Sequence, residues 1–135
     1  MDMVSNMLTS MRNANMKTKE KVDIPFSTFK AGIAKILVEE GFVSGYKVLS
    51  IELNKKTAKR KIIRITLKYA KNKQPVLKGL KRVSKPSLRV YRSHDNIPRI
   101  RAAFGVTILY TSKGLLTDRT ARKERIGGEV LCHVW

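Results

Sequence analysis

Apolar side chains in the N-terminal part of the chain recur first at helical and then at strand-like spacing. Residues 3–14 repeat apolar positions every three or four residues, which predicts an amphipathic helix. Residues 22–24 predict a short strand ended by a proline. A second helix is predicted to begin after Ser27, a residue type that caps helices, and to end at Gly41.

The period of the pattern changes to two beyond residue 42. Residues 46–53 predict one strand and residues 63–69 a second, in which apolar side chains alternate with charged or hydroxyl ones. The basic stretch 55–61 between them predicts a hairpin loop. This order of helix, strand, helix, strand and strand predicts an N-terminal α+β lobe over residues 1–73, which a linker-like stretch of Lys, Asn, Gln and Pro follows.

The remaining residues, 74–135, predict a second lobe that is mainly β with a short helix. The predicted strands cover residues 80–83, 88–91, 106–111 and 130–135. Residues 96–104 predict a short helical turn, because Pro98 suits an early helix position. A better helix is predicted after Thr117, whose hydroxyl can cap it, and the glycine pair at 127–128 ends it. The predicted fold class is therefore α+β with two small lobes.

The charge balance points to a polyanionic partner. The 135 residues hold 29 Lys and Arg against 10 Asp and Glu, a formal net charge of +19, and every charged side chain between residues 53 and 94 is cationic. A solvated surface normally mixes both signs, and added Asp or Glu serves solubility better than added Lys or Arg. Each phosphate that a cation neutralises releases condensed counterions, so a nucleic acid explains the excess best. A membrane surface would need a long basic amphipathic helix, whereas the basic stretch predicts strands and loops.

Few residues support catalysis or cofactor binding. The single cysteine, Cys132, excludes an internal disulfide and a cysteine-pair zinc site, and it alternates with apolar neighbours as a buried strand residue does. The acids of the C-terminal half lack metal-ligand spacing, and no phosphate-binding glycine motif occurs. His94 beside Asp95, with Ser112 as nucleophile, is an arrangement that two histidines produce by chance. The sequence thus predicts no enzyme, no cofactor, no metal and no membrane span.

Three C-terminal segments carry groups suited to nucleic-acid contact. Residues 82–91 surround a Pro turn with cations, hydroxyls and an aromatic ring, although the same pattern fits an edge strand with solvated lysines. Residues 111–114 bring two hydroxyls, a cation and a glycine to the end of a strand. Glu129 follows two glycines, where its carboxylate either pairs with a local Arg or accepts hydrogen bonds from a base.

These segments resemble a known family, the bacterial and plastid type of small-subunit ribosomal protein eight. The C-terminal signature matches in order and spacing at RVSKPSLRVY (82–91), IPRI (97–100), GVTILYTSKGLLTDR (105–119) and IGGEVLC (126–132). The N-terminal half resembles the family at MLTSMRNA (7–14) and EEGF (39–42). The IPRI string, the ERIGGE run (124–129) and the terminal Trp135 resemble the plastid branch more than the bacterial one.

The resemblance implies a two-lobed scaffold, not a catalyst, that binds the central domain of 16S-type ribosomal RNA directly and early in assembly. It implies neighbouring small-subunit ribosomal proteins as partners, with protein five as the family expectation, and no membrane or small-molecule substrate. It places the protein in the ribosome, in a chloroplast stroma by preference or otherwise in a bacterial cytoplasm. In the family, the loop matching residues 111–114 enters the irregular core of an RNA helix, helped by the Tyr matching Tyr91 and the Glu matching Glu129.

The residues expected to contact RNA combine these groups with surrounding cations. They are Arg12, Asn13, Lys59, Arg60, Lys61, Arg82, Ser84, Lys85, Arg89, Tyr91, Tyr110, Thr111, Ser112, Lys113, Gly114 and Glu129. Two positions depart from the family pattern, Tyr110 in place of Ser and Ser87 in place of Gly, and Tyr110 either stacks on RNA or turns inward. The alternative function is a general architectural nucleic-acid-binding protein, which would bind duplex DNA as well as structured RNA at matched salt.

Overall fold

The computed structural model describes residues 3–52, 59–98 and 105–135. Its helices and antiparallel sheets confirm the predicted α+β class. Contacts between Cα positions divide the described residues into an N-terminal unit, residues 9–76, and a C-terminal unit, residues 77–135 with residues 3–8. The predicted domain boundary after residue 73 stays a prediction.

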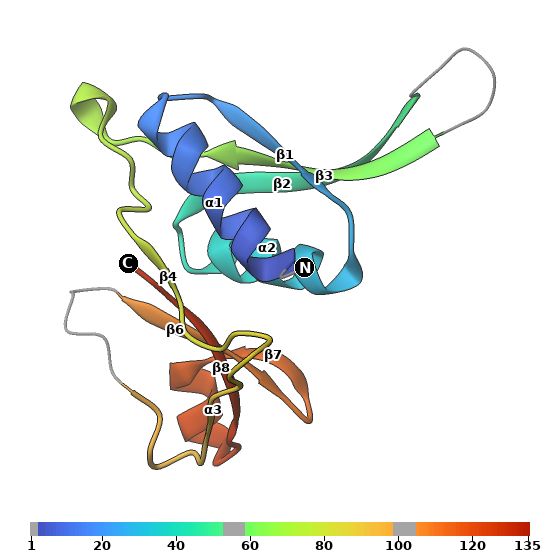
Figure 1. The fold of residues 1–135 in the computed structure, drawn as a ribbon. Coiled ribbons are helices and arrows are strands. Elements are labelled where there is room, and N and C mark those ends of the chain that lie inside the picture. The colour runs from blue at the N-terminus through green and yellow to red at the C-terminus, as the bar shows by residue number, and fades with distance from the viewer. Residues whose placement is uncertain (1–2, 53–58, 99–104) are drawn as a thin grey trace. The chain divides into compact units, whose positions relative to one another are not determined.

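A three-stranded antiparallel sheet forms the body of the N-terminal unit (Figure 1). The elements in chain order are α1 (Met3–Met16), which belongs to this unit from residue 9 on, β1 (Lys21–Pro25), α2 (Thr28–Glu39), β2 (Val43–Glu52), β3 (Lys59–Leu67) and the 3-10 turn η1 (Lys71–Lys73). The strand order is β1-β3-β2, so β3 is the central strand. Its alternating residues Ile63, Ile65 and Leu67 are buried, as the period-two pattern predicts.

Both predicted helices of this part of the chain are confirmed, and local signals explain the bounds of α2. The Ser27 hydroxyl accepts a hydrogen bond from the backbone N–H of Lys30 at 3.1 Å, which satisfies one of the free donors at the start of α2. Gly41 lies just beyond the helix at φ +80°, a conformation that glycine adopts without strain. Ile33 and Leu37 on α2 are fully buried, and α2 packs against β2.

The predicted hairpin loop 55–61 is partly wrong. Residues 59–61 belong to β3, where they pair with residues 50–52 of β2, and residues 55–58 lie outside the described part of the chain. β1 pairs only with residues 62–66, so β2 and β3 continue past it as a two-stranded ribbon (Figure 1). Backbone pairing with β2 outweighs the weak strand preference of the basic side chains.

The C-terminal unit is built around one central strand, β8. Its elements are β4 (Leu80–Arg82), β5 (Tyr91–Arg92), β6 (Val106–Thr111), β7 (Gly114–Thr117), α3 (Asp118–Glu124) and β8 (Gly128–Val134). The antiparallel order is β4-β8-β6-β7, with β5 also paired to β8. α3 packs against β6 and β7, and a core forms from Ile97, Leu109, Ala121 and Val130.

The strands and the helix of this unit differ from the prediction in three respects. The predicted strand 88–91 is reduced to its end, because Lys85 and Leu88 instead bridge each other across a tight turn, and the ladder with β8 begins only at Tyr91. β7 was not predicted as a strand, since it is short and gains its hydrogen bonds from β6. α3 ends at Glu124, before the glycines, because the next residue, Arg125, adopts the left-handed conformation at φ +56°.

The predicted helical turn at residues 96–104 finds no support in its described part. Residues 96–98 are not helical, and residues 99–104 lie outside the described part of the chain.

A network of polar side chains links α3 to the C-terminal sheet. The Thr107 hydroxyl lies 2.9 Å from Nδ1 of its cross-strand partner His133. The backbone N–H of Thr107 donates to Asp118 at the start of α3, and Arg122 of the same helix pairs with that carboxylate at 2.9 Å. Burial lowers the pKa of His133, and nearby Lys81 lowers it further while Asp118 opposes the shift.

We expect this network to make stability depend on pH. Because the folded state disfavours the imidazolium, the unfolded chain takes up the proton first as the pH falls below 6.5, the ordinary His value, and stability falls with it. Urea unfolding at pH 7.5 and 5.5 measures the loss, and His133→Asn should reduce it. An identical loss in the wild type and the variant would contradict the assignment.

Candidate nucleic-acid interface

Glu129 lies between two exposed tyrosines on one face of the C-terminal sheet. The register sets Glu129 of β8 opposite Tyr91 of β5 on one side and Tyr110 of β6 on the other. Directly opposed residues of an antiparallel ladder share a face, with Cβ atoms about 4.5–5.5 Å apart. Tyr91 is 65% exposed and Tyr110 49%, while the Glu129 side chain is only 12% exposed. The row therefore presents two accessible rings beside one recessed carboxylate.

Two side chains from the segment 84–89 hold the Glu129 carboxylate. The Ser84 hydroxyl donates to Oε2 at 2.7 Å, and the Arg89 guanidinium pairs with the same oxygen at 3.1 Å. Ser84 is fully buried, and its oxygen also accepts from the backbone N–H of Val90 at 3.1 Å. A buried carboxylate needs such partners, because desolvation without them costs several kcal/mol, roughly. The arrangement fixes Glu129 and ties the turn at 85–88 to β8.

The hairpin between β6 and β7 presents Ser112 to solvent. Thr111 and Gly114 pair across a two-residue turn, and Gly114 takes φ +92°. The buried Thr111 hydroxyl closes this turn by donating to the Gly114 carbonyl at 2.8 Å and accepting from the Lys113 N–H at 3.1 Å. Ser112 and Lys113 at the tip are exposed, and the Lys113 ammonium lies 3.8 Å from Glu124. The hydrogen-bonded turn thus presents one hydroxyl and one cation to solvent at its tip.

Two glycines let the strands approach closely beside this hairpin. A Cβ at Gly127 would lie 2.5 Å from the Arg92 carbonyl oxygen, and a Cβ at Gly128 would overlap the carbonyl oxygen of Tyr110. The result is a shallow cavity of about 460 Å³. It is lined by Tyr91, Tyr110, Thr111, Ser112, Gly127, Gly128 and Glu129.

The C-terminal candidates therefore come together, but their roles differ. Ser84 and Thr111 are buried and hold neighbouring groups, and Arg82 donates to the Leu131 carbonyl at 3.0 Å. The exposed candidates are Lys85, Arg89, Tyr91, Tyr110, Ser112 and Lys113. The sequence-based list omitted Gly127 and Gly128, although paired glycines at the start of a strand signal a close backbone approach.

The remaining candidates belong to the N-terminal unit. Arg12 and Asn13 are exposed on α1, and Lys59, Arg60 and Lys61 are exposed on β3. The Lys61 ammonium lies 5.4 Å from the centre of the Phe26 ring, so it covers an aromatic face as well as carrying charge.

The geometry gives little support to a catalytic or metal site. Asp95 accepts a hydrogen bond from Ser93 at 2.6 Å, which engages the carboxylate that was considered as an orienting group for His94. Burial raises the pKa of the Cys132 thiol to about 12, so it is no nucleophile. Over the described ranges, no group of three His, Cys, Asp or Glu side chains could hold a metal ion. None of the described helices is long and apolar enough to cross a membrane.

Comparison with known proteins agrees with this geometry. The family described as "Ribosomal protein S8" matches residues 2–135. The chain belongs to the ribosomal protein S8 family. Two proteins named "Small ribosomal subunit protein uS8" are similar over 99% of this chain. The one from Endomicrobium trichonymphae is 51% identical, and the match covers 98% of its length. The one from Caldicellulosiruptor bescii is 50% identical, and the match covers 97% of its length.

Membership in the S8 family bears on two of the sequence-based predictions. The family is a structural ribosomal one, so the protein is not an enzyme. The similar proteins named above come from bacteria, and the comparisons give no support to the plastid preference drawn from the IPRI and ERIGGE strings.

The close approach at Gly128 yields a test of the cavity. We expect Gly128→Ala to push β8 away from β6, because the added Cβ meets backbone that cannot move aside, and to cost about 1–3 kcal/mol of stability. Gly45→Ala is the matched control, since a Cβ there meets nothing within 4 Å. Urea unfolding measures both variants, and equal stabilities would contradict the close approach.

Proposed function

We propose that this S8-family chain, a structural component of the small ribosomal subunit, binds the central domain of 16S-type ribosomal RNA directly, with its selective groups on the C-terminal unit and further phosphate contacts from cations on β3. The finer assignments are also part of the proposal: an early role in assembly, ribosomal protein five as a neighbour, and a bacterial cytoplasm as the compartment. The names of the bacterial relatives support the ribosomal setting.

The observation that carries the proposal is the row of Tyr91, Glu129 and Tyr110 beside the Ser112 tip. Exposed rings give stacking surfaces for unpaired bases, and each stacked base contributes about 1–3 kcal/mol. Regular A-form RNA hides its base edges in a deep groove, so such rings suit an irregular helix with displaced bases. The exposure of Tyr110 favours the stacking role over the inward one considered for this departure from the family.

Glu129 adds hydrogen-bonding selectivity to this surface. Ser84 and Arg89 both bind Oε2, and no hydrogen bond among the described residues occupies Oε1. Oε1 is therefore available to an amino group on a base edge, which a carboxylate recognises as an acceptor. Ser112 supplies a donor and acceptor short enough to reach a sugar hydroxyl or a base edge. The two groups distinguish an RNA shape, whereas the surrounding cations do not.

The first test isolates the Ser112 hydroxyl. We expect Ser112→Ala to weaken binding to a transcript of the cognate central-domain helix about fivefold to tenfold, the value of one hydrogen bond, with almost no change in the salt slope. Filter binding across a salt series measures both quantities, and Ser44→Ala, an exposed serine on β2, is the control. An unchanged dissociation constant would refute the assignment.

The second test isolates the cations on β3. Converting Lys59, Arg60 and Lys61 to Gln should lower the salt slope by about 2–3 and weaken binding to all RNAs alike, because phosphate contacts carry no sequence information. A similar loss of selectivity in this variant and in Ser112→Ala would contradict the division of roles.

The alternative, a general architectural binder, has a separate outcome. It predicts that duplex DNA binds as tightly as the structured RNA at matched salt, whereas the proposed function predicts a large preference for the RNA. The same salt series with a DNA duplex distinguishes them.

A further inference from the structure

The strand β2 has the longest unpaired edge among the described strands. It pairs only with the central strand β3, so no described strand lies along its other side. β2 has ten residues, whereas the other edge strands β1, β4 and β7 have five, three and four. Proteins usually keep edge strands short or covered, because the free N–H and C=O groups of an edge can pair with another chain. The edge of β2 departs from this rule.

The middle of this edge is accessible and partly apolar. Val48 is 45% exposed although it is a large apolar residue, and its neighbour Lys47 is exposed as well. The pairing with β3 is irregular between Val43 and Gly45, and it is regular from Gly45 to Glu52. The regular part of β2 can therefore accept an added strand without a change in its own backbone.

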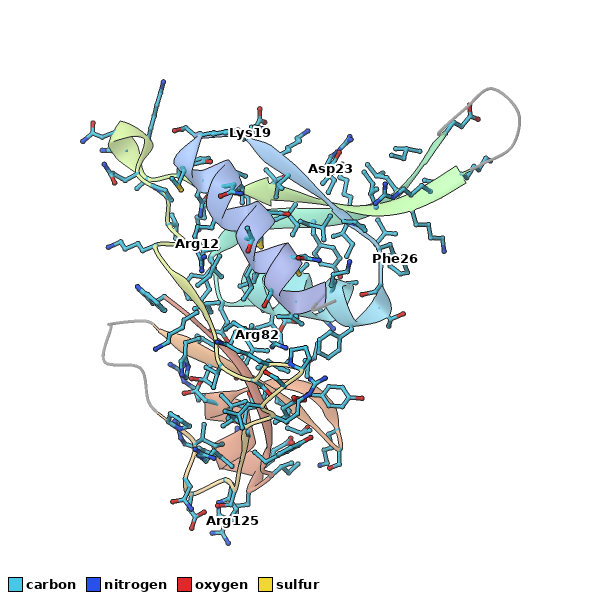
Figure 2. All side chains as sticks on the ribbon, in the orientation of Figure 1. Arg12, Lys19, Asp23, Phe26, Arg82 and Arg125 are labelled. Carbon is cyan, nitrogen blue, oxygen red and sulfur yellow. The ribbon has the colours of Figure 1, made fainter. Side chains whose placement is uncertain are left out.

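The side chains at the edge include one cation without a partner. The register aligns Asp23 of β1, Arg64 of β3 and Lys47 of β2 in one cross-strand row, and Figure 2 shows Asp23 on its strand. Arg64 donates to both carboxylate oxygens of Asp23, at 2.8 and 3.1 Å, and so neutralises it. No carboxylate of the described residues forms an ion pair with Lys47. The row thus ends at the open edge with an uncompensated positive charge.

We propose that β2 binds an extended segment of another protein, which adds to the N-terminal sheet as a fourth strand. Backbone hydrogen bonds along residues 45–52 supply the affinity, and the side chains supply the selectivity. Neighbouring residues of a strand point to opposite faces, so the segment carries an acidic residue opposite Lys47 and an apolar residue opposite Val48. This interaction is separate from the proposed RNA contact and does not rest on it.

Charge and hydrogen bonding favour this occupant over two others. A chain of net charge +19 attracts an acidic segment, whereas a second copy of the same chain is repelled. RNA fits the edge poorly, because its phosphates only accept hydrogen bonds and a strand edge offers both donors and acceptors. An acidic and apolar protein segment satisfies the backbone groups, Lys47 and Val48 together.

Hydrogen exchange of the full chain tests the added strand directly. The probe is a synthetic peptide of alternating Glu and Val, equal in length to β2, and its control is the same peptide methylated on every backbone nitrogen. At ten times its dissociation constant, the probe should slow exchange about tenfold at every second amide of residues 45–52, because alternate residues direct their N–H groups to the open edge. The methylated peptide should protect none of them. Absence of protection, or equal protection of consecutive amides, would overturn the inference.

A charge reversal tests the contact at Lys47. We expect Lys47→Glu to weaken binding of the Glu-Val peptide about threefold to tenfold, because a like charge then lies opposite the acidic residue. Lys71→Glu is the matched control, since it makes the same charge change at an exposed position outside the sheet. Isothermal titration of both variants measures the difference. An equal loss in the two would mean general charge attraction and contradict the register.

The other occupants have their own outcomes. Alternating protection of β2 without peptide, which grows with protein concentration together with a dimer in sedimentation, would assign the edge to a second copy. Alternating protection by the cognate RNA helix in place of the peptide would assign it to RNA. Either result would overturn the inference.

Discussion

The hydrogen bond and ion pair that hold the Glu129 carboxylate are the interactions on which the C-terminal unit's surface depends. A recessed carboxylate in a strongly cationic chain is stable only if partners replace its lost hydration. Ser84 and Arg89 come from a segment about forty residues earlier in the sequence, so they meet Glu129 only when β5 is paired to β8. The same pairing sets Tyr91 beside the carboxylate. One ladder therefore assembles the stacking ring, the acceptor and its supports together.

The hydroxyl groups of this unit divide between support and recognition according to burial. Ser84 and Thr111 are buried, and their hydroxyls serve Glu129 and the hairpin turn. Ser112 is exposed at the tip, where its hydroxyl is available to a partner. In the sequence these three residues are equivalent hydroxyls near cations, so only the pairing register separates them. Most of these hydroxyls therefore support the fold, and few are left for recognition, as expected of a structural member of the S8 family.

The parts of the fold that local signals specify could be predicted, and those that depend on distant pairing could not. Capping at Ser27 and the glycine at 41 delimit α2, and the apolar run of residues 106–109 predicts the buried strand β6. β5 and β7 are too short for a periodic pattern and exist because β8 and β6 supply their hydrogen bonds. The close approach at Gly128 likewise depends on Tyr110, a residue remote in sequence. The sequence therefore predicted which segments form the candidate site, but not which of their residues support it and which are exposed to a partner.

Acids are scarce in the chain, so most of the described lysines form no ion pair with a described carboxylate. The chain has 10 acids against 29 cations, and its shortest described ion pairs join carboxylates to arginines: Asp23 with Arg64, Asp118 with Arg122, and Glu129 with Arg89. Glu39 and Glu124 form longer pairs, at 3.9 and 3.8 Å, with Lys35 and Lys113. Arginine suits this use because its planar fork matches a carboxylate, whereas lysine remains hydrated. The lysines then repel one another, and a net charge far from zero opposes the compact state. A polyanion that binds the folded chain more tightly than the unfolded one removes this repulsion preferentially from the folded state, so the excess charge that drives association also couples RNA binding to folding stability.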